Sequence, residues 1–438
     1  MYLDRGKFTL RRQKRSRPGR VALYLALIVL GIYIIREQHQ GNVRPMLMAT
    51  PTATRSAVSF AEEAEAHFSA GRLRRAIETY QKATEAEPAN AAYWVKLARL
   101  QVYAGDAEAG LESANTAVLV LPEDSSAHAV RAFALDWTGD YEEGSRASVR
   151  AIQLDPNNAL AHAYYAEILT DLQKYAQAGD EARLAVSLNS NSMDVQRAYG
   201  YYLESVAAYE DAIIAYQTAA TINPNLGLIY MRLGLSYRVL GQYETAVEYF
   251  QRASALDPKD TAPLLSIART YFQTGEYQRA AQYIETALEL EPTNPDIYGR
   301  LGLVEFKALN YEGAVTDLGC AIDGCTHPLT AAVVSGMPLK PETLEYYYTY
   351  GSVLAAYLKC DRALPVFSQV AAFAADDEVV QNIVAEGRAI CEQGGTPSVE
   401  TNTAEPNKTP AANKTAMPVA SETPQPAATP LPLPVTNG

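Results

Sequence analysis

Residues 233–260 read LGLSYRVLGQYETAVEYFQRASALDPKD, and this stretch decides the fold. Apolar residues recur at helical spacing as far as Leu240, and Gly241 then interrupts the period. Glycine suits the C-terminus of a helix, where positive φ is needed. A second helical period runs to Leu256 and stops before Pro258, where no amide is available to prolong a helix. The stretch therefore predicts two short helices joined by a tight turn.

The same layout repeats every 34 residues. Eight consecutive segments covering residues 57–328 align without a gap, and three columns of this alignment contain only Ala or Gly. The columns are Ala64, Ala98, Ala132, Ala166, Gly200, Gly234, Ala268 and Gly302; Ala76, Gly110, Gly144, Ala178, Ala212, Ala246, Ala280 and Ala314; and Ala83, Ala117, Ala151, Ala185, Ala219, Ala253, Ala287 and Ala321. A fixed period of this length indicates stacked units. Small side chains let helices approach closely, so we expect the first two columns inside each helix pair and the third where the next pair docks.

These columns resemble the tetratricopeptide repeat, whose pattern is W-x2-L-G-x2-Y, then A-x3-F, then A and P. The resemblance is carried by Tyr230, Leu233, Gly234, Tyr237, Ala246, Phe250, Ala253 and Pro258, and in an earlier unit by Trp94, Leu97, Ala98, Ala117 and Pro122. It implies an all-α, right-handed superhelical solenoid of helix-turn-helix repeats. Some units depart from the pattern, which leaves the geometry of their corners open. Gln173, Ala207 and Leu309 replace the turn Gly, and Ser190 and Thr326 replace the terminal Pro.

The chain beyond the eighth unit is predicted in three parts. Residues 329–343 have no clear period and are expected to form an inserted loop. Residues 344–394 supply a ninth unit and one amphipathic helix, which covers the apolar face that a solenoid otherwise leaves in water. Residues 395–438 are rich in Pro and Thr and lack aromatic residues, so we expect this tail to be disordered.

The N-terminal end predicts a membrane anchor of bacterial type. Residues 1–20 carry eight basic side chains and one acidic one. The next segment, residues 21–36, contains the uncharged run VALYLALIVLGIYII and favours an uncleaved transmembrane signal anchor. A cleaved signal peptide and a buried core helix are the alternatives. The basic flank predicts a cytoplasmic N-terminus, which places the repeats outside the cytoplasm at the cell membrane. Residues 37–56 are then expected to be a linker between the membrane and the first repeat.

The charge balance bears on the class of partner. The formal net charge of the whole chain is −13, although its first segment is basic. An acidic body argues against nucleic-acid binding, which rewards clustered Lys and Arg.

The four cysteines, Cys320, Cys325, Cys360 and Cys391, allow three disulfide pairings. Cys360 follows the first helix of the ninth unit, and Cys391 lies near the end of the next helix of that type, which should stack beside it. This placement favours Cys360–Cys391 together with Cys320–Cys325. The alternative is free buried thiols in a cytosolic protein. The spacings do not form the paired C-x2-C knuckles of a zinc site, and no metal is predicted.

His128 and His162 are 34 residues apart, in a column where other units have Trp94, Tyr230 or Tyr298. Metal ligation requires side chains that converge on one ion, whereas equivalent positions of stacked units lie too far apart. The pattern therefore favours packing over ligation for both histidines.

No motif for phosphate binding, zinc proteolysis, serine hydrolysis or dithiol chemistry occurs, and the sequence predicts neither an enzyme nor a cofactor. In the resembled family, the first helices line a concave groove that binds partner proteins or peptides. One subtype grips a C-terminal carboxylate through Lys and Asn at fixed positions. Those positions here hold Ala61, Val95, Ala129, Glu65, Arg99 and Phe133, so that clamp is not expected.

The resemblance places fourteen side chains in the groove, and packing inside the superhelix is the alternative role of each. They are Arg99, Val102, Tyr103, Phe133, Trp137, Tyr164, Arg197, Tyr201, Met231, Leu235, Arg238, Arg269, Phe272 and Phe306. Aromatic and Arg side chains are the usual anchors of interfaces. The sequence thus predicts a membrane-anchored extracytoplasmic scaffold or adaptor. The alternative is a non-catalytic assembly subunit of a cell-envelope enzyme complex or secretion machine.

Overall fold

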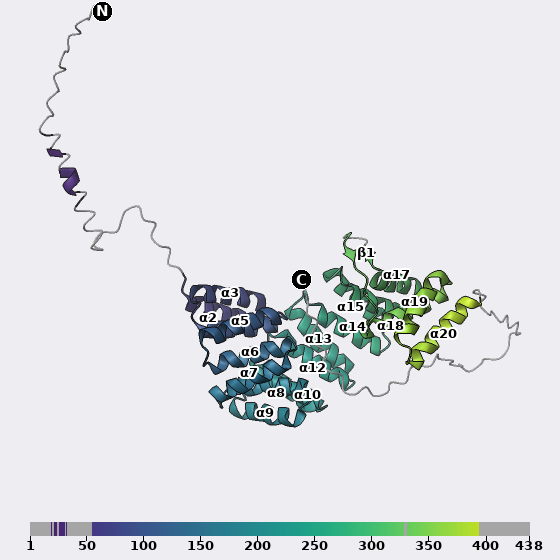
Figure 1. The fold of residues 1–438 in the computed structure, drawn as a ribbon, viewed down its shortest axis with the longest axis horizontal. Coiled ribbons are helices and arrows are strands. Elements are labelled where there is room, and N and C mark those ends of the chain that lie inside the picture. The colour runs from purple at the N-terminus through teal and green to yellow at the C-terminus, as the bar shows by residue number, and fades with distance from the viewer. Residues whose placement is uncertain are drawn as a thin grey trace, which may run out of the picture. The chain divides into compact units, whose positions relative to one another are not determined.

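The computed structural model describes residues 19, 22–23, 26–30, 32, 55–327 and 331–393. From residue 56 onward these residues form one compact unit of stacked helix pairs (Figure 1). The first helices of the pairs are α2 (Ala57–Ser69), α4 (Ala91–Tyr103), α6 (Ser125–Trp137), α8 (Ala159–Asp171), α10 (Met193–Ser205), α12 (Gly227–Val239), α14 (Thr261–Gln273), α16 (Pro295–Lys307) and α18 (Leu344–Ala356). The second helices are α3 (Leu73–Ala86), α5 (Ala107–Val120), α7 (Tyr141–Leu154), α9 (Tyr175–Leu188), α11 (Tyr209–Ile222), α13 (Tyr243–Leu256), α15 (Tyr277–Leu290), α17 (Tyr311–Asp323) and α19 (Cys360–Phe373). The predicted α-solenoid of helix pairs is confirmed.

The predicted segments 1–20, 21–36, 37–56 and 395–438 lie wholly or largely outside the described residues. Within the described part of the chain, every helix is too short or too polar to cross a membrane.

Each helix pair turns through one residue with positive φ. In five pairs this residue is Gly71, Gly105, Gly139, Gly241 or Gly275. Gln173, Ala207, Leu309 and Leu358 occupy the same place in the others, with φ between 56° and 64°. The chain therefore keeps one corner geometry even where it lacks glycine, at the steric cost that an L-residue pays in the left-handed region.

All the Ala and Gly residues of the three columns are buried. A Cβ added to Gly200 would lie 2.6 Å from Cε1 of Tyr216, and one added to Gly302 would lie 2.6 Å from Cγ of Leu318. In both cases the neighbour belongs to the second helix of the same pair. The small residues are therefore needed because the partner helix leaves no room for a larger side chain.

The column that contains the two histidines has a shared hydrogen bond. Each of six side chains bonds to the backbone carbonyl six residues earlier, at the end of the preceding unit. The pairs are Trp94 with Pro88, His128 with Pro122, His162 with Pro156, Gln196 with Ser190, Tyr230 with Pro224 and Tyr298 with Pro292, at 2.7–3.1 Å. His162 also contacts Glu181 through Nδ1 at 2.5 Å. Both histidines therefore tie one unit to the next, which is the packing role that the sequence favours.

The stack ends in a cap. Residues 325–343 contain two short antiparallel strands, β1 (Cys325–Thr326) and β2 (Val333–Val334), and the 3₁₀ turn η1 (Pro341–Thr343). The expected loop is thus partly ordered. The last helix, α20 (Glu378–Glu392), packs on α18 and α19.

The structure joins Cys360 to Cys391, with Cα atoms 5.5 Å apart, and Cys320 to Cys325. This is the pairing that the sequence favours. The first bridge ties the start of α19 to the end of α20, and the second closes a short loop after α17.

Candidate partner-binding face

Two further columns run along the first helices at the 34-residue period. One contains Arg99, Phe133, Glu167, Tyr201, Leu235, Arg269 and Leu303, and the other contains Val102, Asp136, Thr170, Glu204, Arg238, Phe272 and Phe306. They include most of the side chains predicted for the groove. In the first half of the stack most residues of these columns are buried, whereas in the second half they remain accessible. The accessible half is the candidate site.

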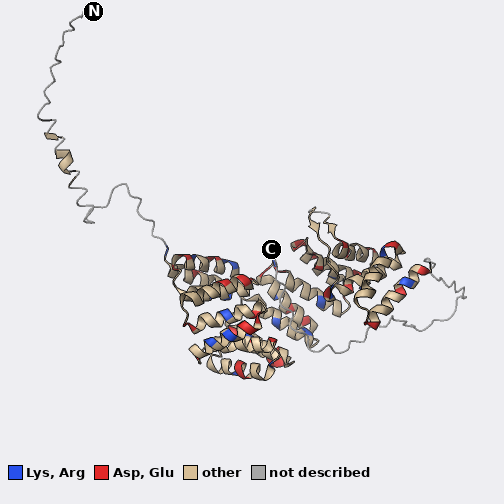
Figure 2. Ribbon diagram, viewed as in Figure 1, with Lys and Arg blue, Asp and Glu red and all other residues tan. Residues whose placement is uncertain are grey.

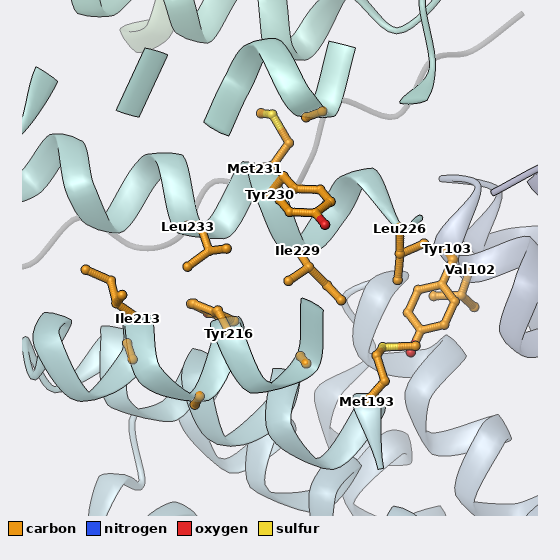
Figure 3. Close-up of a cluster of buried hydrophobic side chains, with 14 of the residues drawn as sticks. Val102, Tyr103, Met193, Ile213, Tyr216, Leu226, Ile229, Tyr230, Met231 and Leu233 are labelled. Carbon is orange, nitrogen blue, oxygen red and sulfur yellow. The ribbon is translucent and has the colours of Figure 1, made fainter. Parts of the chain in front are cut away.

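In the first half of the stack, helices α4, α6, α8 and α10 pack directly against one another. The stack curls so tightly that Arg99 of α4 reaches Asp194 of α10, with a nitrogen–oxygen distance of 3.2 Å. Val102 and Tyr103 of α4 also lie in one apolar cluster with Met193 of α10 (Figure 3). The first helices therefore line the inside of the coil, and this part of the inside is filled.

The curl also brings the first unit against the turn that joins the fifth unit to the sixth. The side-chain amide of Asn225 donates a hydrogen bond to the carbonyl of Ser69, at 2.7 Å. A Cβ added to Gly71 would lie 2.9 Å from the carbonyl oxygen of Asn225. A cleft of about 510 Å³ opens beside this contact, with Leu73 and Lys259 among its lining residues.

A buried polar network fills the inside from α4 to α10. Asp194 accepts hydrogen bonds from Tyr103 and from Tyr164, the latter at 3.0 Å. Arg197 pairs with Glu167 at 2.7 Å, and its guanidinium lies 5.0 Å from the ring centre of Phe133. Because these charges are paired, and Asp194 also accepts hydrogen bonds from two hydroxyl groups, burial here does not leave them isolated.

Most of the predicted groove residues on these helices belong to that filled interior. The buried ones are Val102, Tyr103, Phe133, Tyr164, Arg197 and Tyr201, and Met231 of α12 is buried as well. Arg99 is mostly covered and Trp137 is half-buried against Phe133. The buried side chains therefore pack inside the superhelix, which is the alternative to partner binding that the sequence left open. The accessible face is thus smaller than the prediction, because helices separated by several units meet across the coil.

The interior acids divide into two electrostatic classes. Burial raises the pKa of Asp194, but Arg99, the Tyr103 hydroxyl and Arg197 outweigh it and leave the pKa lowered. Asp136 is also buried, and one of its carboxylate oxygens has no hydrogen-bond partner among the described residues. Burial and the neighbouring carboxylates of Asp171 and Glu167 raise the pKa of Asp136 well above its usual range. One acid therefore stabilises the interior when ionised, whereas the other does so when protonated.

Direct packing between the first helices falls away along α12, α14 and α16. The same two columns consequently remain accessible there. Leu235, Arg238, Phe272, Leu303 and Phe306 are half-buried and Arg269 is exposed. We call these six residues the open inner face. It combines four apolar side chains with two arginines, which is the composition of a protein-binding surface.

A family model described as Tetratricopeptide repeat matches residues 67–132 and 240–299, and a second model with the same description matches residues 200–261. The chain contains tetratricopeptide repeats. The two models overlap at residues 240–261, and residues 240–299 include part of the open inner face.

Several solved structures are similar to the chain. PilF of Pseudomonas aeruginosa is 22% identical, with a TM-score of 0.39, over 44% of this chain and 88% of that one. PilW, a type IV pilus biogenesis factor, is 21% identical, with a TM-score of 0.42, over 44% of this chain and 90% of that one. The APC/C hetero-tetramer Cut9–Hcn1 is 15% identical, with a TM-score of 0.49, over 76% of each chain. None of the curated proteins matches the chain.

Sequence reasoning did not identify the interior acids Asp136, Glu167 and Asp194. Acidic residues on short helices ordinarily face solvent, and nothing local marks these as buried. Their register is a usable signal, because Asp136 and Glu167 stand in the two columns of the tetratricopeptide repeats that also contain Arg99, Phe133 and Val102. A charged residue in such a column needs a partner across the coil.

Proposed function

We propose that the chain is a non-catalytic scaffold that binds partner proteins or peptides on its open inner face. The observation that carries this proposal is the contrast within the two columns. From α4 to α10 they fill the interior, whereas the equivalent residues of α12, α14 and α16 remain accessible. An elongated face with aromatic and Arg side chains suits an extended or helical segment of another protein.

We further propose that the scaffold works outside the cytoplasm and is anchored by residues 21–36. The two disulfides support an oxidising location, since structural disulfides persist mainly outside the cytosol. The uncharged run after a basic segment supports the anchor and its orientation. Blocking of free thiols in intact cells, followed by mass spectrometry, tests the location. Four blockable thiols without prior reduction would contradict it.

Affinity purification of the full chain tests the binding role. We expect Phe272→Ser combined with Phe306→Ser to lose the partners that the wild type retains. Leu119→Ser combined with Leu184→Ser is a matched control, because it also removes exposed apolar side chains, but from the second helices α5 and α9. Equal recovery of partners by all three proteins would contradict binding on the open inner face.

The same experiment separates two forms of scaffold. Several weak ligands would indicate an adaptor that collects different proteins. One stoichiometric catalytic partner would instead indicate an assembly subunit of an envelope enzyme complex or secretion machine.

A further inference from the structure

Two arginines of the open inner face have no acidic partner. Arg238 lies near the end of α12, and Arg269 lies in the middle of the next first helix, α14. Neither forms an ion pair or a side-chain hydrogen bond with another described residue. The guanidinium of Arg238 lies 5.9 Å from the ring centre of Phe250.

In the filled part of the coil, arginine side chains are paired with acidic residues. There Arg99 pairs with Asp194, Arg197 pairs with Glu167 at 2.7 Å, and Arg232 lies 3.6 Å from Glu204. Acidic and basic residues are interspersed over the helices (Figure 2). An unmatched pair of arginines on the inside is thus a departure from the chain's own pattern.

The electrostatics of Arg238 agree with the absence of an acidic partner. Burial and the positive charge of Arg269 together lower the pKa of Arg238 to about 10. The acid that precedes Arg238 in its column, Glu204 of α10, lies 3.6 Å from Arg232 and accepts a hydrogen bond from the Tyr216 hydroxyl at 2.7 Å. Glu305 of α16 lies beside Asp317 of α17 and Asn310, and therefore faces the second helix of its own pair. The local charge of the open inner face is therefore positive on a chain whose net charge is −13.

We propose that Arg238 and Arg269 bind Asp or Glu side chains of an acidic partner segment, whose apolar residues contact Phe272 and Phe306. Guanidinium groups bind carboxylates through paired, charge-assisted hydrogen bonds. The apolar flank supplies the area that an interface needs beside its charged contacts. This inference rests on the proposed function, because it names the partner chemistry of the same face.

The partner is a different protein with a locally acidic segment. A second copy of this chain also carries excess negative charge, and selection from a peptide library distinguishes the two sources. The probe is a library of random twelve-residue peptides displayed at the N-terminus of a phage coat protein. In that format, carboxylates come only from Asp and Glu side chains.

Panning on the immobilised full chain is expected to enrich peptides that combine Asp or Glu with aromatic or aliphatic residues. The best selected peptide is then synthesised and titrated by fluorescence anisotropy. We expect Arg238→Gln combined with Arg269→Gln to weaken its binding at least about tenfold, because a carboxylate loses both cationic partners. Binding to the wild type is expected to weaken as salt concentration rises.

The matched control is Arg146→Gln combined with Arg183→Gln. It removes the same charge from exposed positions on the second helices α7 and α9, where each arginine already has an acidic neighbour. Binding by this control is expected to stay within about twofold of the wild type.

Four other outcomes count against the inference. Selected peptides without acidic enrichment, or acidic peptides that bind the Arg238 and Arg269 variant normally, overturn the acidic-partner assignment and leave peptide binding on this face intact. The absence of any selected peptide overturns both proposals. Self-association that the arginine variant abolishes, with no peptide bound, replaces the partner protein with a second copy of the chain.

Discussion

Arg99 and Asp194 form an ion pair at 3.2 Å although 95 residues separate them in the chain. The contact closes the coil from α4 to α10 and buries the columns that would otherwise face a partner. It also concentrates the candidate binding face on α12, α14 and α16. Stability and function therefore use equivalent positions in different parts of the same array.

Replacement of Asp194 should open this closure. Asp194→Asn leaves Arg99 without its buried acid, and loss of one member of a buried pair costs about 3–5 kcal/mol. Urea unfolding at pH 7 measures the change in the free energy of unfolding. The pKa of Asp194 is lowered in the folded state, so its contribution is present above the unfolded value of about 4 and is lost as pH falls further. The difference from the wild type should thus shrink in acid. A similar loss from Asp180→Asn, in an exposed pair with Arg183, would show that burial is not the cause.

Asp136 predicts the opposite dependence on pH. Its folded pKa is raised, so ionisation destabilises the fold, and stability falls as pH rises from about 4 through the folded pKa. Asp136→Asn should remove this loss and stabilise the protein at pH 8 by about 1 kcal/mol or more, since each unit of a raised pKa corresponds to ~1.4 kcal/mol. Urea unfolding at pH 5 and pH 8 gives the difference, with exposed Asp376→Asn as the control. An advantage that is equal at both pH values would contradict the electrostatic explanation.

Gly234 tests the small-residue columns. A Cβ there would overlap the ring of Phe250, which is fully buried. Gly234→Ala should therefore lower the free energy of unfolding by about 1–3 kcal/mol through overpacking. Gly227→Ala lies on the same helix, where the nearest atom to the new Cβ is 3.6 Å away, and should be neutral or stabilising by up to ~1 kcal/mol. In thermal and urea unfolding, Gly234→Ala should be less stable than the wild type, and Gly227→Ala should be equally stable or more stable. Equal effects would mean that helix propensity, and not packing, controls this column.

Leu309 tests the corners that lack glycine. Its φ is 64°, and its side chain is 71% exposed, so that replacement loses little packing. Relief of the left-handed strain favours glycine by about 1–2 kcal/mol, and the greater freedom of glycine in the unfolded chain offsets about 0.4–1 kcal/mol of that gain. Leu309→Gly should therefore raise the free energy of unfolding by roughly 0.5–1 kcal/mol. The reverse change, Gly241→Ala at φ 73°, should lower it. Destabilisation by Leu309→Gly would mean that the exposed leucine makes contacts that the corner needs.

The repeat period predicted the helix pairs because each column obeys a local rule. A small residue at one position, such as Gly234, is required by the helix that follows it in the same pair. The corner at Leu309 was harder to predict, since backbone hydrogen bonds of the turn hold its φ whichever residue is present. Leu309 donates its amide to Phe306, as Gly241 does to Arg238.

The extent of the candidate site could not be predicted in the same way. Whether Phe133 or Phe272 faces a partner depends on how far each pair rotates relative to the next, and small rotations add up over several units. Phe133 and Phe272 each lie in one of the two columns that line the inside of the coil, but one is buried and the other half-buried. Only the meeting of Arg99 with Asp194 distinguishes them, and that contact joins units far apart in the chain.

The hydrogen bond from Asn225 to Ser69 has a mechanical consequence for the whole array. In repeat proteins each unit ordinarily contacts only its neighbours, so that unfolding spreads from one unit to the next. Here the first unit is hydrogen-bonded to the end of the fifth, so that fraying at the N-terminal end must also release the middle of the chain. A pull on the N-terminal end would accordingly be resisted by several units at once.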